Sequence, residues 1–170
     1  TDLLYTRVMD WDVPPNVFSE LVTVQGVGAT NLVLSHDNGF ADVNPLANPG
    51  ALTPGTTNVN FTDVGPSDHG AYFKFNFGTL AAGATRTFTI FYGATPSERT
   101  ALAALGAVGA EVYSFGQWRG DGANGTPGTY IWGFKGVGGK PIGGVPEPST
   151  LLLVLSGLGL TAATRMRKSN

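Results

Sequence analysis

Residues 71–92 read AYFKFNFGTLAAGATRTFTIFY and contain two runs in which apolar and polar side chains alternate. In the first run every second residue is Phe, and in the second run Phe88 and Ile90 alternate with Thr. Successive side chains of a strand point to opposite faces, so each run predicts a strand with Phe or Ile toward the core and Thr toward water. The Gly-containing link at 78–83 predicts that the two strands pair as an antiparallel hairpin.

Shorter apolar or alternating runs predict further strands on both sides of this segment. They lie at 3–12, 18–24, 31–35, 59–64, 111–117 and 129–137. In the second of these runs we expect Phe18, Val22 and Val24 to share one face. Residues 37–58 are rich in Asp, Asn, Pro, Gly and Thr, which is typical of a long loop. About seven strands with mostly short connections predict an all-β fold, an antiparallel β-sandwich.

One short inserted helix is predicted after the second run. The sequence TPSE at 95–98 has the residue types of a capping box, with Thr95 as the N-cap and the Glu98 carboxylate reaching back to it. Apolar residues follow at helical spacing, and Gly106 and Gly109 are candidate stops.

Composition excludes several classes of function. The chain has 170 residues, which favours one domain, and only 13% of them are charged. Cysteine is absent, so disulfides and thiolate metal sites are excluded. Three of the ten Lys and Arg residues lie among the last six positions, which leaves seven against twelve acidic residues. Nucleic-acid binding needs a basic face, so we expect no nucleic-acid partner.

A Pro-Glu-Pro motif stands near the C-terminus. It consists of Val145, Pro146, Glu147, Pro148 and Ser149. Two prolines fix φ and keep the segment out of a helix, and Glu147 adds a charge. An enzyme can therefore meet a stiff, charged, extended strand at this point.

An uncharged, Leu-rich run follows the motif at 149–164. As a helix these 16 residues are about 24 Å long. This is somewhat shorter than the hydrocarbon core of a bilayer, which is ~30 Å thick and takes ~20 helical residues to span. The basic residues Arg165, Arg167 and Lys168 predict a stop on the cytoplasmic side. We therefore expect a C-terminal transmembrane helix at about 149–164 with a basic tail at 165–168. The alternative, a helix packed on the body, is disfavoured because the run has no polar face.

The order of Pro-Glu-Pro motif, apolar run and basic end resembles the PEP-CTERM sorting signal of Gram-negative bacteria. The resemblance implies that the tail is held transiently in the inner membrane and is cut by a transpeptidase-like enzyme, an exosortase. It implies export to the cell surface or extracellular matrix, and a link to exopolysaccharide and biofilm. The phrases FNFGTLAAG at 75–83 and EVYSFGQ at 111–117 also resemble the bodies of uncharacterised members.

The chain divides into three parts on this interpretation. Residues 1–137 form the β-sandwich body, 138–145 a Gly- and Pro-rich linker, and 146–170 the sorting signal. The first residue is Thr and no secretory signal peptide is visible, although the C-terminal signal is intact. We therefore expect the sequence to be a translated gene fragment.

Acidic residues and histidines in the body are candidate site residues. Asp10 and Asp12 point to one side of a strand, as a Ca²⁺ site or an acid and base pair would require. The pairs at 36–37 and 68–69, each one His and one Asp, would form a metal pair or a His–Asp dyad if the fold brought them together. Residues 121–128 faintly resemble a calcium loop. Surface turns explain all of these residues more simply, so we expect no catalytic residue, metal or cofactor.

Among the Trp residues, Trp118 precedes an Arg and a loop, which makes it the best candidate for contact with a glycan. The leading hypothesis is a non-catalytic surface or matrix protein with a structural or adhesive role. A carbohydrate-binding module that holds exopolysaccharide is the alternative, and a secreted hydrolase is the third.

Overall fold

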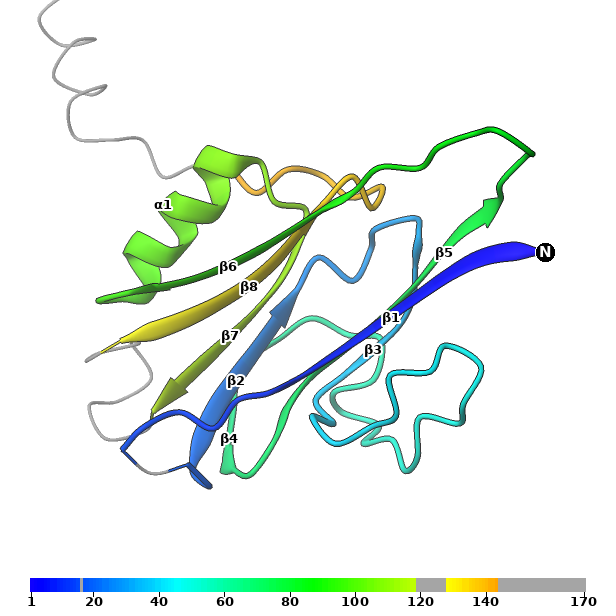
Figure 1. The fold of residues 1–170 in the computed structure, drawn as a ribbon. Coiled ribbons are helices and arrows are strands. Elements are labelled where there is room, and N and C mark those ends of the chain that lie inside the picture. The colour runs from blue at the N-terminus through cyan, green and yellow to red at the C-terminus, as the bar shows by residue number, and fades with distance from the viewer. Residues whose placement is uncertain (16, 119–127, 144–170) are drawn as a thin grey trace, which may run out of the picture.

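The computed structural model describes residues 1–15, 17–118 and 128–143. Within these residues the chain forms eight strands and one helix (Figure 1). In chain order they are β1 (Asp2–Asp10), β2 (Glu20–Gln25), β3 (Leu32–His36), β4 (Phe61–Ser67), β5 (Gly70–Thr79), β6 (Thr89–Thr95), α1 (Glu98–Val108), β7 (Val112–Trp118) and β8 (Thr129–Lys135).

The strands form two antiparallel sheets. One has three strands in the order β1-β5-β3, and the other has five in the order β4-β2-β7-β8-β6. Their facing sides share an aromatic core, in which Phe73 of the first sheet lies 5.1 Å from Trp132 and 5.2 Å from Phe134 of the second, between ring centroids. All three side chains are fully buried, and burial of each stabilises the fold by about 1.5–3 kcal/mol. The predicted all-β fold of antiparallel sheets with one short helix is confirmed.

The predicted hairpin at 71–92 is wrong. β5 pairs with β1 and β3, whereas the partner of β6 within the described residues is β8, in the other sheet. The link between β5 and β6 therefore passes from one sheet to the other. Phe77 and Phe88 still meet, with ring centroids 4.9 Å apart. Alternation specifies which side chains are buried, and a link of this length does not force its two strands to pair.

The helix begins two residues later than predicted. Its N-cap is Ser97, whose Oγ accepts the Thr100 N–H, while the Thr100 hydroxyl accepts the Ser97 N–H. Thr95 is not the cap, because it is the last residue of β6 and pairs with Thr129 of β8. Gly109 ends the helix in the left-handed conformation, with φ 68°, as one of the two predicted stops.

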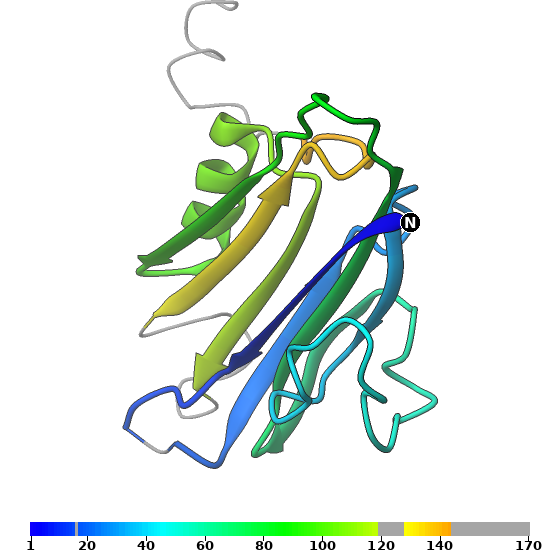
Figure 2. The same cartoon turned by 45° about the vertical axis from the view of Figure 1, so that its right-hand side comes forward.

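The helix covers the outer face of the five-stranded sheet (Figure 2). Ala101 and Leu105 are buried against side chains of β7 and β8, among them Phe115 and Ile131. These alternate with the inward-facing side chains of the same strands, so both faces of this part of the sheet are covered. β7 and β8 consequently have few polar side chains at their centres.

The long loop predicted at 37–58 is present and lies on the side of the three-stranded sheet (Figure 2). It is held by repeated Asx-turns, in which a side-chain oxygen accepts the N–H two residues further on. The residues that supply these oxygens are Asn38, Asp42, Asn44 and Asn48.

The strand predicted at 18–24 begins later in the structure. The second strand starts at Glu20, and Phe18 is not part of it but lies in a turn with 65% of its surface exposed.

No helix within the described ranges is both long and apolar enough to cross a membrane. The span predicted at 149–164 lies outside those ranges.

Candidate functional site

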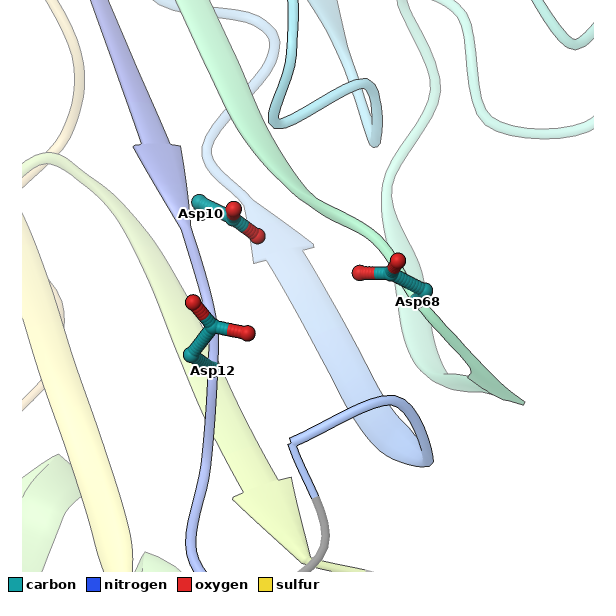
Figure 3. A group of neighbouring side chains, drawn as sticks. All are labelled: Asp10, Asp12 and Asp68. Carbon is teal, nitrogen blue, oxygen red and sulfur yellow. The ribbon is translucent and has the colours of Figure 1, made fainter.

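Three carboxylates lie together at one end of the two sheets (Figure 3). Asp10 is the last residue of β1, Asp12 follows two residues later, and Asp68 lies in the turn between β4 and β5. The antiparallel pairing of β1 with β5 places Asp10 opposite Gly70, which brings this turn beside it. One oxygen from each carboxylate lies within 4.8 Å of one from each of the others. We call these three residues the acidic trio.

The charges of the acidic trio repel one another. Partial burial raises the pKa of Asp10, and the charges of Asp12 and Asp68 raise it further. Carboxylate oxygens are preferred Ca²⁺ ligands, and the trio offers three of the roughly six to eight that Ca²⁺ takes. All three residues are exposed, and exposed acidic groups commonly gather without an ion. The geometry therefore makes the trio a candidate cation site and does not by itself assign a function.

A buried glutamate lies near the trio and was missed by sequence reasoning. Glu20 starts β2 with only 1% of its surface exposed, and its Oε1 accepts the Val13 N–H at 3.3 Å. Its Oε2 has no hydrogen-bond partner in the described part of the chain. Burial raises the pKa of Glu20, the bond from Val13 opposes this, and the charges of Asp68 and Asp12 add to the rise. Its only signal in the sequence is an acid at the head of an apolar run.

The fold joins one histidine to one aspartate from the two candidate pairs. His69 Nδ1 lies 3.3 Å from Asp37 Oδ2, and His69 Nε2 lies 3.3 Å from the Glu20 carbonyl oxygen. The Thr56 hydroxyl donates to the other Asp37 oxygen at 2.7 Å. This dyad ties the long loop to the turn between β4 and β5. His36 is buried elsewhere, against Tyr72.

The tryptophans divide between core and sheet end. Trp132 is fully buried, and Trp11 is buried with its Nε1–H donating to Ser114 Oγ at 3.0 Å. Trp118 is half-buried at the end of β7 and packs against the core. Its contact with a glycan stays a prediction. The calcium-loop candidate at 121–128 falls almost entirely outside the described residues.

Comparison with protein-family models matches residues 144–168 to the PEP-CTERM protein-sorting motif. The chain carries a PEP-CTERM sorting motif. The match contains the five residues of the Pro-Glu-Pro motif and the three basic residues that the sequence singled out. These are Val145, Pro146, Glu147, Pro148, Ser149, Arg165, Arg167 and Lys168, all outside the residues that the structure describes. Neither curated proteins nor solved structures gave a match.

The PEP-CTERM motif begins directly after the last described residue, Gly143. The residues before it are bonded to the body, chiefly through Glu111, which sequence reasoning also missed. Glu111 accepts backbone N–H groups from 136–139. The only signal was a lone acid between a helix stop and an apolar strand. The division into body, linker and sorting signal stays a prediction, but the first part of the predicted linker makes these contacts.

Proposed function

We propose that this chain is an exported protein whose tail is inserted in the inner membrane and cut by an exosortase near Pro146-Glu147-Pro148. The body then stays at the cell surface or in the extracellular matrix. The observation that carries this proposal is the PEP-CTERM match at 144–168. A motif of this kind implies export and processing by an exosortase.

We propose a structural or adhesive role for the body and no catalysis. Many of its aromatic side chains lie in the core and cannot contact a ligand, among them Phe73, Phe75 and Trp132, which are fully buried. The two histidines are held in contacts within the body, His36 on Tyr72 and His69 on Asp37. An affinity gel carrying the host's exopolysaccharide separates this role from carbohydrate binding. Retention of the body that is lost with Trp118→Ala, with an unchanged melting curve, would establish the alternative.

Two substitutions test the sorting step in a host that carries an exosortase. Leu153→Asp places a charge in the predicted span, which costs ~2.5–3.5 kcal/mol at mid-membrane. A span of about 24 Å has little reserve, so this variant should leave the membrane uncut. Glu147→Ala should insert normally but be processed poorly. A tagged protein, followed by fractionation and gel mobility, reports both. Processing of both variants at the parental rate would refute the proposal.

A further inference from the structure

The end of the body is fastened by one carboxylate. Glu111 Oε1 accepts the Gly136 N–H at 2.9 Å, and its Oε2 accepts the Val137 N–H at 2.8 Å and the Gly139 N–H at 3.0 Å. Burial raises the pKa of Glu111, but the hydrogen bonds from Gly136, Gly139 and Val137 outweigh it and hold the pKa below its ordinary value. We call this set of contacts the Glu111 clamp.

Further contacts extend the fastening to residue 142. The Thr30 and Asn31 N–H groups donate to carbonyl oxygens of 137–138 at 3.0 and 3.1 Å. The Ile142 N–H donates to the Ala110 oxygen at 2.8 Å, and the Ile142 side chain packs against the cluster under α1. The body therefore holds the chain up to two residues before the sorting motif begins.

This fastening limits the chain between body and motif. Glu147 lies five positions after Ile142, and this stretch of chain reaches at most about 17 Å. A body of this size has a radius of gyration of about 14 Å. When the motif occupies the active site of an enzyme, a tether this short holds the folded body in contact with the enzyme or the membrane.

We propose that Glu111 is a positioning residue for processing of the PEP-CTERM motif. Its clamp keeps the tether short, and the crowding by the folded body slows the cut. If loss of the clamp also releases the contacts that Thr30, Asn31 and Ala110 make with residues 137–142, the chain is free from Lys135 onward and the reach to Glu147 rises to about 40 Å. This inference rests on the proposed function, because it concerns the rate of the same cut.

The test compares two ways of lengthening the tether. Glu111→Ala removes the acceptors. Hydrogen exchange at the amides of Gly136, Val137, Gly139 and Ile142 shows whether the clamp and the bond from Ile142 to Ala110 have both opened. Seven Gly and Ser residues inserted after Gly143 lengthen the tether and leave the body untouched. Each change should shorten the half-time of processing by about twofold or more, because a tether too short to span its sites suppresses the reaction. Together they should add little beyond either alone.

A disulfide provides the matched control. A Cβ built at Gly139 would lie 3.3 Å from the Ala29 Cβ, near the 3.5–4.5 Å of a disulfide, and the chain has no other cysteine. It would also lie 2.9 Å from the Glu111 Cβ, so the backbone at residue 139 must shift slightly to accept the cysteine. Ala29→Cys with Gly139→Cys in the Glu111→Ala variant should therefore close the tether again. The reach from residue 139 to Glu147 is then about 26 Å, so processing should slow toward the parental rate and speed up again when a reductant is added.

The outcomes separate this inference from the function on which it rests. Faster processing of both lengthened variants, reversed by the disulfide, supports the inference. Parental rates in both, with fast exchange at these four amides of Glu111→Ala, overturn it and leave the sorting function intact. An uncut parent chain in an exosortase host overturns the proposed function, and the inference with it.

Discussion

The imidazole ring of His36 stacks on the phenol ring of Tyr72, with centroids 4.3 Å apart and planes inclined by 14°. Both side chains are fully buried. His36 Nδ1 accepts the Asn38 N–H at 3.0 Å, while its Nε2 has no hydrogen-bond partner among the described residues. Burial lowers the pKa of His36 to about 4, against the opposing charge of Asp37. The folded protein therefore holds this ring neutral at pH values where the unfolded chain protonates it.

We expect acid to destabilise the body through His36. Below the ordinary pKa of 6.5 the unfolded state binds a proton that the folded state does not bind until about pH 4. The free energy of unfolding is unaffected by His36 above pH 6.5 and falls by about 3 kcal/mol as the pH is lowered across this window. His36→Phe keeps an aromatic ring on Tyr72 and removes this titration, so its stability should fall less than that of the parent over the same range. Urea denaturation at several pH values measures both slopes, and equal slopes would contradict the assignment to His36.

The helix cap gives a second prediction. Ser97→Ala removes the oxygen that accepts the Thr100 N–H and should lower the free energy of unfolding by about 1 kcal/mol. Thr95→Ala is the matched control, because the Thr95 hydroxyl donates to the Ser97 carbonyl oxygen and accepts no helical N–H in the described part of the chain. Denaturant melts compare the two. A greater loss for Thr95→Ala would place the start of the helix where the sequence alone put it.

The difference between the two caps shows what sequence patterns decide. Thr95 and Ser97 are both good cap residues, and a capping box fits either position. The choice is made by β8, which continues to pair with β6 as far as Thr95 and keeps that residue extended. The partner strand comes more than thirty residues later in the chain. Local propensity therefore predicted the helix, and long-range pairing set its first residue.

The residues of the candidate site also divide into those that local sequence patterns predict and those that depend on long-range strand pairing. Alternation along β1 placed Asp10 and Asp12 on one side, and both are in the acidic trio. Asp68 joins them only because β5 pairs with β1, a partner that alternation did not identify. The whole sorting motif could be predicted from the sequence, because a linear signal is recognised by the order of its residues and needs no fold. Glu20 was missed because an acid buried in an apolar strand contradicts the general rule for burial.

Close packing of Trp11, the residue after β1, on Gly116 of β7 gives a third prediction. A Cβ at Gly116 would lie within 2.6 Å of the Trp11 Cε3 atom, in the buried core. Gly116→Ala should therefore cost about 1–3 kcal/mol of stability through overpacking. Gly28→Ala is the control, because a Cβ at Gly28 meets nothing within 4 Å. Thermal melts of both variants test this, and an unchanged Gly116→Ala would mean that Trp11 is not seated over this strand.

The acidic trio gives the last prediction. In a chelator at neutral pH, Asp10→Asn should raise the free energy of unfolding by ~0.5 kcal/mol, because it removes one of three mutually repelling charges at an exposed site. Asp42→Asn is the control, since it also removes one exposed charge, and the amide oxygen can still accept the Asn44 N–H.

Titration with Ca²⁺ then measures whether the trio binds an ion. Binding would stabilise the parent in proportion to the logarithm of the Ca²⁺ concentration above the dissociation constant. It would thereby reverse the order of parent and Asp10→Asn, because the variant lacks one ligand. A parent that stays less stable than Asp10→Asn at millimolar Ca²⁺, while Asp42→Asn follows the parent, would show three carboxylates that repel one another without an ion. Equal stability of all three proteins in the chelator would show instead that water screens the repulsion completely.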